Sequence, residues 1–296
     1  PWENAVISGI GCSSRLPYYM NTYAMQTIHG RAAAISTGAK VANPNLTVWQ
    51  ISGDGDGLAI GGNHFIHAVR RNIDLNMILL NNRIYGLTKG QYSPTSKLGK
   101  ITKTSPYGTV EKPFNPGELV IGAKGTFFAR SIDMEVNLTK ECLIAAAKHQ
   151  GMSVTEVLQN CVIFNDKTHA AFAGDKATRQ EHTITLRHGE KMLFGANNEK
   201  GLVFEDMRLK VVTVGQDGYT LDKILTHDAH TKDTTLHSML AAMKYPDYPV
   251  ALGVIRSVED EIVYDQAVEK QVEEVKAQSK IHCVDDLLHS GATWEI

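Results

Sequence analysis

The stretch SGDGDGLAIGGNHF, residues 52–65, stands between an apolar run and a segment with helical spacing. The run before it, LTVWQIS (46–52), is rich in β-branched residues and is expected to be a buried strand that stops at Gly53. Residues 58–72 repeat apolar side chains at helical spacing, and LNMILLNN (75–82) is a second buried strand. A strand, a glycine turn, a helix and a strand make a βαβ unit, whose two strands are expected to be parallel.

The rest of the chain extends this pattern. AVISGIG (5–11) predicts a strand that ends in a glycine turn, and residues 83–118 predict a long loop. Parallel units with covered faces indicate an α/β fold with a doubly wound, mostly parallel sheet. We expect one domain at residues 1–190 and a C-terminal extension at 191–296, packed on this domain or on a partner subunit. The other expected elements are helices at 28–42, 137–151 and 259–278 and a strand with a turn at 154–166.

Composition and charge argue against several classes of protein and of site. A net charge of −2 over 296 residues argues against a general nucleic-acid binder, which would carry a basic excess. No apolar run approaches the roughly 20 residues that span a membrane, and no signal peptide is visible, so we expect a cytoplasmic protein. The four cysteines form no CxxC pair, and disulfides are not expected. THDAHTKD (226–233) is interpreted as a solvated loop rather than a metal site.

The acidic glycine turn has three interpretations. A calcium loop of the EF-hand kind needs a glutamate at its twelfth position, and counting from Asp54 that position is Phe65. A dinucleotide turn needs GxGxxG, which neither GDGDGLAIGG nor GIGCSS provides, and carboxylates would repel a pyrophosphate. The third interpretation places a divalent metal between the carboxylates and a phosphate, because Mg²⁺ is commonly shared between protein carboxylates and ligand phosphates.

A second metal ligand is expected where the chain returns to the same edge of the sheet. Asn81 and Asn82 stand there, and 25 residues, 56–80, separate them from the GDG triplet. GDG followed at this distance by a pair of asparagines is the thiamine diphosphate motif. The alternative interpretation is an ordinary βα turn beside a polar strand end.

Seven further stretches carry a family resemblance: GIGCSS (9–14), HGRA (29–32), ANPNLTV (42–48), GDGDGLAIGGNH (53–64), LLNNRIYGLTKGQYSPTS (79–96), PFNPGEL (113–119) and VLQNCVIFND (157–166). On these motifs the chain resembles the thiamine-binding β subunit of the 2-oxoacid:ferredoxin oxidoreductases. CSSR and VLQNC look most like the members that use 2-oxoglutarate. The resemblance covers roughly the first two thirds of the chain, and the last third has weaker markers.

The resemblance implies a reaction and its partners. A 2-oxoacid, coenzyme A and oxidised ferredoxin give an acyl-CoA, CO2 and reduced ferredoxin, and in many organisms the reaction also fixes CO2. For 2-oxoglutarate the product is succinyl-CoA. The glutamate that activates the aminopyrimidine of the cofactor belongs to another subunit, a larger α or fused γα chain. We therefore expect this chain to be active only with that partner.

The resemblance also implies which residues hold the cofactor. Asp54 and Asn82 would supply side-chain oxygens to Mg²⁺, and Ile84 its backbone carbonyl. Arg15 would face the substrate carboxylate, with a surface arginine as the alternative. His29 would lie near the reacting carbon, with a structural histidine as the alternative. The remaining residues expected to bind the cofactor are Gly11, Cys12, Ser13, Gly30, Gly53, Gly55, Asp56, Gly86, Leu87 and Thr88.

Two cysteines resemble ligands of an iron–sulfur cluster. Cys12 and Cys161 match positions that hold the [4Fe–4S] cluster of this family, which takes four thiolates. The other two are expected in a CxxC some 20 residues before Cys12, upstream of Pro1, and we expect the sequence to be truncated there. The alternative is a subunit without the cluster. Cys142 and Cys283 are interpreted as structural.

Two other functions stay open. The first is a non-redox thiamine enzyme, such as a decarboxylase or acetolactate-type synthase, which would have no use for Cys12 and Cys161. The second is a non-catalytic metal- or diphosphate-binding subunit. Iron and acid-labile sulfide in the complex would distinguish the oxidoreductase from both. Among the oxidoreductases, pyruvate or another 2-oxoacid is the alternative substrate to 2-oxoglutarate.

Overall fold

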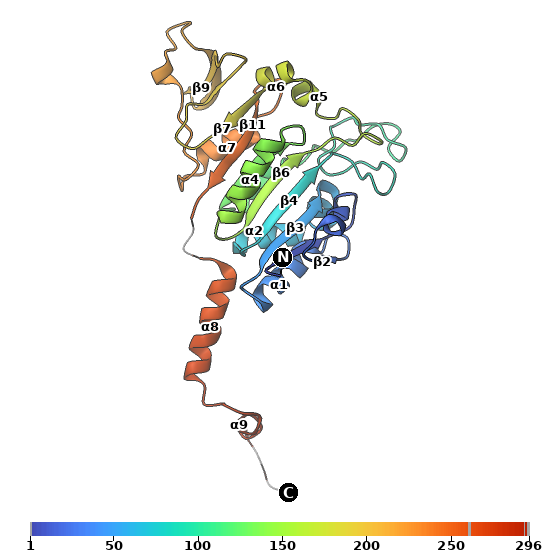
Figure 1. Cartoon of the computed structure of the whole chain (residues 1–296), viewed down its shortest axis with the longest axis vertical. Helices are drawn as coiled ribbons and strands as arrows, with labels where there is room; N and C mark the ends of the chain where they lie inside the picture. Colours follow the sequence, from blue (N-terminus) through green and yellow to red (C-terminus); the bar gives the residue numbers. More distant parts are fainter. Residues whose placement is uncertain (1, 260–261, 293, 295–296) are drawn as a thin grey trace.

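The computed structural model describes residues 2–259, 262–292 and 294, and its centre is one eight-stranded sheet (Figure 1). Neighbouring strands are parallel except β11 against β5, as the sequence predicted for a mostly parallel sheet. The strands, in their order across the sheet, are β2 (Tyr23–Gln26), β1 (Asn4–Ser8), β3 (Thr47–Gly53), β4 (Asn76–Asn81), β6 (Ser153–Leu158), β5 (Phe127–Ile132), β11 (Val250–Ser257) and β7 (Thr183–Leu186).

The predicted helices form, with shifted ends. The helix expected at 28–42 begins only at Ala32, and the long loop after β4 ends at Asn115. The side chain of Asn115 accepts a hydrogen bond from Gly117 N (3.1 Å) and Pro116 follows it, a combination that favours a helix start. The helices of this part are α1 (Ala32–Ala42), α2 (Gly62–Arg71), α3 (Pro116–Gly122), α4 (Val136–Lys148), α5 (Ala170–Ala173), α6 (Lys176–His182) and α7 (Thr235–Ala242).

The topology fixes where a ligand can bind. From β1 the chain crosses to β2 on one side and then returns to β3 on the other side of β1. A doubly wound sheet opens a crevice at the carboxyl ends of strands where the connections diverge in this way. The segments that follow β1 and β3 are GIGCSS and GDGDG. The loop after β4, teal in Figure 1, lies at the end of the sheet toward which the arrows of β4 and β6 point.

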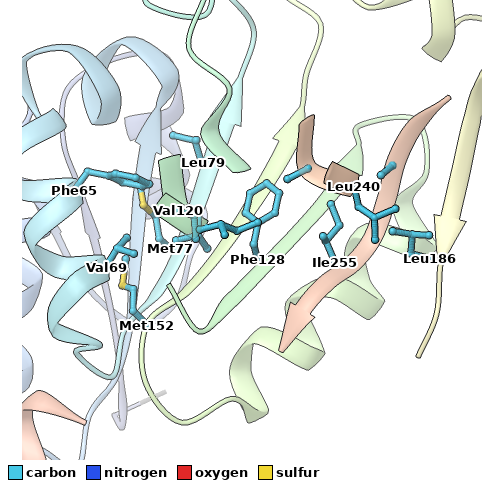
Figure 2. Close-up of a cluster of buried hydrophobic side chains, with 14 of the residues drawn as sticks. Phe65, Val69, Met77, Leu79, Val120, Phe128, Met152, Leu186, Leu240 and Ile255 are labelled. Atoms are coloured by element: carbon cyan, nitrogen blue, oxygen red, sulfur yellow. The ribbon is translucent and has the colours of Figure 1, made fainter. Parts of the chain in front are cut away.

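One hydrophobic core joins the two ends of the sheet (Figure 2). Phe65 and Val69 of α2 pack near Met77 of β4, and all three are at most 1% exposed. Burying a side chain of this size contributes about 1.5–3 kcal/mol. The same core continues to Ile255 of β11 and Leu240 of α7, so residues 191–296 supply a strand and a helix to the main body.

The remaining elements of residues 191–296 lie outside the eight-stranded sheet. A small antiparallel sheet contains β8 (Leu193–Phe194), β9 (Lys200–Glu205) and β10 (Arg208–Thr213), and a short 3₁₀ turn, η3, follows at Leu221–Lys223. The charged helix predicted at 259–278 begins at Tyr264 as α8 (Tyr264–Gln278), and residues 260 and 261 lie outside the described part. Figure 1 shows α8 and α9 (Val284–Leu288) extending away from the sheet.

The structure shows the surroundings of His227, Cys142 and Cys283, which the sequence placed outside the candidate site. THDAHTKD is not a solvated loop throughout, because His227 is 1% exposed and its Nε2 lies 2.9 Å from Val254 O of β11. Burial lowers the pKa of His227. Cys142 is buried in the core, as expected, whereas Cys283 is exposed and caps α9. Within the described residues, no helix combines the length and the apolar character that crossing a membrane requires.

Candidate active site

A cavity of about 600 Å³ lies at the carboxyl ends of β1, β3, β4 and β6, where the sequence predicted the cofactor. Each of these neighbouring strands is followed by a loop that lines it. The structure brings together there every predicted site residue except Gly30. These lining residues are Gly11, Cys12, Ser13, Arg15, His29, Gly53, Asp54, Gly55, Asp56, Asn82, Ile84, Gly86, Leu87, Thr88 and Cys161.

Asp56 ties three segments of the site together. Its carboxylate is buried, and Oδ1 accepts hydrogen bonds from Ile10 N (3.1 Å), His29 Nδ1 (2.9 Å) and Gly30 N (2.7 Å). A side chain on Gly9 would overlap the Asp56 carboxyl group, which explains the glycine at the end of β1. Gly30, at φ +70°, therefore acts through Asp56 and does not line the cavity.

These contacts determine the tautomer of His29. Its Nδ1 faces two acceptors, Asp56 Oδ1 at 2.9 Å and Ile10 O at 3.2 Å, so Nδ1 carries the hydrogen. In the neutral ring Nε2 then has a free lone pair. His29 is partly exposed and lines the cavity. The arrangement leaves a nitrogen in the site that can accept a proton.

Asp54 is held by two hydroxyl groups that the sequence analysis did not assign. Its Oδ2 accepts hydrogen bonds from Ser93 Oγ and Thr95 Oγ1, both at 2.5 Å. All three residues are at most 2% exposed. Burial raises the pKa of the Asp54 carboxyl group, and the two hydroxyl bonds oppose this only in part. Both residues belong to QYSPTS (91–96), which supports the family resemblance but does not by itself link these hydroxyls to Asp54.

The residues around Asp54 fit a magnesium ion. Asp54, Asn82 and Ile84 line the same cavity, and they offer a carboxylate, an amide oxygen and a backbone carbonyl. Mg²⁺ prefers such oxygen ligands, and a divalent cation would compensate the buried charge of Asp54. Ile84 N donates to Asn82 Oδ1 (3.1 Å), and Arg83 between them has φ +56°, a strained conformation for this residue type. The backbone turn that presents these oxygens is thus held locally.

Tyr85, in the loop after β4, packs against the GDGDG turn that follows β3. Its hydroxyl donates to Gly55 O (2.9 Å), and its ring leaves no space for a side chain on Gly55. Burial, together with the charges of Asp54 and Asp56, raises the pKa of Tyr85 to about 12. GDGDG continues into a π-helical turn, η2 (Asp56–Ile60), a feature found often at functional sites.

The two cysteines predicted to bind a cluster lie at the same end of the cavity. A Cβ on Gly86 would stand 3.0 Å from Cys12 Sγ and 3.6 Å from Cys161 Sγ. Burial and the nearby Cys161 raise the pKa of the Cys12 thiol, which a metal centre bound to both sulfurs would offset. Two thiols fit half of a four-thiolate cluster. Among the described residues, no group of three or more histidine, cysteine or acidic side chains is arranged to hold a metal.

Arg15 lies at the mouth of the cavity. It is exposed, and its guanidinium lies 5.4 Å from the centre of the Tyr18 ring. No carboxylate of the described part of the chain is paired with it. Arg15 can therefore bind the carboxylate of a ligand.

Comparisons with known proteins agree with this geometry. The family "Thiamine pyrophosphate enzyme, C-terminal TPP binding domain" matches residues 9–157. The 2-oxoglutarate oxidoreductase subunit KorB of Mycobacterium tuberculosis is 45% identical over 298 residues, which cover 99% of this chain and 79% of the relative. The 2-oxoglutarate synthase subunit KorB of Archaeoglobus fulgidus is 48% identical over 159 residues, 54% of this chain and 60% of the relative.

A solved structure extends the likeness to the whole fold. The 2-oxoglutarate:ferredoxin oxidoreductase from Magnetococcus marinus, solved with 2-oxoglutarate, coenzyme A and succinyl-CoA bound, superposes with a TM-score of 0.74 at 29% identity. The match covers 98% of this chain and 83% of that chain. The chain therefore belongs to the thiamine pyrophosphate (thiamine diphosphate) enzymes and, within them, to the family of the KorB subunits of 2-oxoglutarate oxidoreductases.

Proposed function

We propose that this chain is the thiamine-binding β subunit of an enzyme that oxidises 2-oxoglutarate with coenzyme A. The products are succinyl-CoA and CO2, and the electrons pass through a [4Fe–4S] cluster to ferredoxin. The observation that carries this proposal is the cavity itself. Its lining includes the oxygen-bearing residues Asp54, Asn82 and Ile84 and the two neighbouring thiols of Cys12 and Cys161, at the switch point of the sheet, which supports a Mg²⁺ ion and a cluster at this site. The similarity to subunits of 2-oxoglutarate oxidoreductase and 2-oxoglutarate synthase supports the choice of 2-oxoglutarate.

In this proposal the GDGDG turn and the loop after β4 hold the cofactor. Asp54, Asn82 and Ile84 would bind the Mg²⁺ ion, and backbone groups of Gly53 and Gly55 would approach the diphosphate. Gly86, Leu87 and Thr88 would contact it from the opposite wall. When bound, thiamine diphosphate supplies a carbon nucleophile and an electron sink for decarboxylation.

His29 and Arg15 would act on the substrate. Since Asp56 fixes the hydrogen on Nδ1, His29 can accept a proton at Nε2 and stabilise it through the carboxylate behind the ring. Arg15 can form two parallel hydrogen bonds with a carboxylate, which suits a dicarboxylic 2-oxoacid. The two residues come from the loops that follow β1 and β2 and line the same cavity.

Cys12 and Cys161 would each give one thiolate to a [4Fe–4S] cluster, which supplies one-electron transfer toward ferredoxin. Cys142 lies in the hydrophobic core and Cys283 on the projecting α9, so neither can join them. The remaining two thiolates would come from outside the four cysteines of this sequence. The reaction would also run in reverse and fix CO2 when reduced ferredoxin is abundant.

A larger partner subunit would cover the mouth of the cavity. The segment from the 3₁₀ turn η1 (Ser13–Tyr19) through the edge strand β2 to Ile28 exposes several large apolar side chains. Exposed apolar patches of this kind mark interaction sites, and Tyr19 lines the cavity itself. The partner would bring the glutamate that activates the cofactor. The exposed side chains are Tyr18, Tyr19, Met20, Tyr23, Met25 and Ile28.

The test is the substrate preference of the native complex. The complex is purified without oxygen, and coenzyme A-dependent reduction of a viologen dye is followed with 2-oxoglutarate or pyruvate. The proposal expects reduction with 2-oxoglutarate, dependent on coenzyme A. A preference for pyruvate would overturn the substrate assignment, and dye reduction by this chain without its partner would overturn the partner dependence. A complex without iron and acid-labile sulfide would overturn the redox assignment.

A further inference from the structure

A continuous chain of buried polar groups leads away from Asp54 across three strands. The hydroxyl of Thr95 has one hydrogen, and two acceptors lie within reach of it: Asp54 Oδ2 at 2.5 Å and Asn81 Oδ1 at 2.9 Å. Asn81 Nδ2 donates to Glu156 Oε1 (2.7 Å), and Arg130 Nε donates to Glu156 Oε2 (2.6 Å). Asn81 ends β4, while Glu156 on β6 faces Arg130 on β5 in the strand register.

The side chains that make these hydrogen bonds are almost fully buried. All five are at most 5% exposed. A buried ion pair is costly to desolvate, and apolar residues of similar volume are often as stabilising or more so. Folding stability alone therefore gives little reason for Glu156 and Arg130 at this place. Their contacts point instead to control over the groups bonded to them.

We propose that the Glu156–Arg130 ion pair is a positioning device for Asp54. Glu156 accepts from Asn81 Nδ2 and thereby fixes the orientation of the amide, with Oδ1 directed at Thr95. The reversed amide would place two acceptor oxygens against each other at 2.7 Å. Asn81 Oδ1 and Asp54 Oδ2 then share the single hydroxyl hydrogen of Thr95, so the position of Thr95 against the carboxylate depends on residues two and three strands away. Arg130 is itself anchored, because its guanidinium also donates to Asn115 Oδ1 (3.1 Å).

This inference rests on the proposed Mg²⁺ site at Asp54. Residues that orient a metal ligand typically change metal affinity by about 10–100-fold when they are replaced. The structure offers a matched control, since Ser93 donates to the same Asp54 oxygen as Thr95, at the same 2.5 Å. The hydrogen-bond partners of Ser93 Oγ are Asp54, Thr95 (3.3 Å) and Ser96 (3.3 Å), and Asn81 is not among them. Replacement of Thr95 therefore interrupts the series of hydrogen bonds from Asp54 to Arg130, whereas replacement of Ser93 leaves that series intact.

The experiment uses the complex of this chain with its partner subunit, with thiamine diphosphate present and Mn²⁺ as the metal probe, titrated by electron paramagnetic resonance. The ion pair is replaced as a unit, Arg130→Met with Glu156→Leu, which leaves the net charge unchanged. We expect Mn²⁺ affinity to fall about tenfold. In a Thr95→Val background the same replacement should cause no further loss, and in a Ser93→Ala background it should again cost about tenfold.

Each outcome decides between the accounts. Equal losses in the Thr95→Val and Ser93→Ala backgrounds would mean that the pair acts through space or through general stability, and the inference would be overturned. Unchanged affinity in the pair variant would overturn it too. If Asp54→Ala leaves Mn²⁺ binding intact, the metal assignment of the proposed function falls as well. Glu156→Gln serves as a second variant should the pair variant not fold, with the same comparison of backgrounds.

Discussion

Replacing Gly55 by alanine should destabilise the chain, because Gly55 stands against the ring of Tyr85. The backbone of Gly55 is helical, with φ −67° and ψ −41°, so alanine meets no conformational strain there. A Cβ would nevertheless overlap three ring carbons of Tyr85, the farthest of them at 2.8 Å. Relief requires the ring to move, and the ring is tied to Gly55 O by its hydroxyl at 2.9 Å.

The magnitude follows from three contributions. Overpacking costs about 1–3 kcal/mol, and loss of the Tyr85 hydrogen bond costs about 1 kcal/mol more. The helix preference of alanine over glycine offsets up to about 1 kcal/mol. We expect the free energy of unfolding to fall by about 1–4 kcal/mol in Gly55→Ala. A displaced Tyr85 also intrudes on the cavity that both residues line, so thiamine diphosphate should bind more weakly.

Gly62→Ala is the matched control. Gly62 opens α2 and has no atom within 4 Å of its would-be Cβ, so the variant should be as stable as the original or up to about 1 kcal/mol more stable. Urea unfolding of both variants, followed by fluorescence, gives the two free energies. If Gly55→Ala proves as stable as Gly62→Ala, the close packing of Tyr85 on the GDGDG turn does not constrain the site.

Three other perturbations have expected outcomes. Burial lowers the pKa of His149 and of His169 to about 4, so both histidines must stay neutral in the folded chain. Their contribution to the free energy of unfolding is complete above pH 6.5 and should be lost as the pH drops toward 4. The loss is up to about 1.4 kcal/mol per pH unit for each histidine. Urea unfolding at pH 7 and pH 5 measures this, and a flat profile between them would contradict it. Gly86→Ala should lower the iron and sulfide content of the complex, because the new methyl group stands 3.0 Å from Cys12 Sγ; full iron occupancy would argue against a cluster at that place. Tyr23→Glu should weaken binding of the partner subunit more than tenfold, as measured by co-elution, and undisturbed assembly would place the interface elsewhere.

The sheet and the cavity at which the predicted site residues gather could be predicted from the sequence, because each rests on local spacing. The GDG triplet and the pair of asparagines close consecutive parallel strands, and the ends of such strands meet at one edge. The strand at 46–52 and the strand at 75–82 form within a residue of the expected bounds. The partners of the two aspartates could not be found in this way.

The partners of Asp54 and Asp56 could not be predicted because they come from segments distant in sequence. Asp56 was expected to line a diphosphate, and it does line the cavity, but its carboxylate also binds groups 26 to 46 residues away, from the loops after β1 and β2. Ser93 and Thr95 lie in a loop with no periodic pattern, so nothing in the sequence linked their hydroxyls to Asp54. His227 looked solvated because its neighbours are polar, and only the packing of β11 over it makes it buried.

The central claim is that this cavity holds thiamine diphosphate through a divalent metal at Asp54. The most direct measurement is calorimetric titration of the complex, stripped of cofactor, with thiamine diphosphate in the presence and absence of Mg²⁺. Both the original chain and Asp54→Ala are titrated. The account predicts binding that requires Mg²⁺ in the original complex and is lost in Asp54→Ala. Equal binding without Mg²⁺, or undiminished binding by Asp54→Ala, would contradict it.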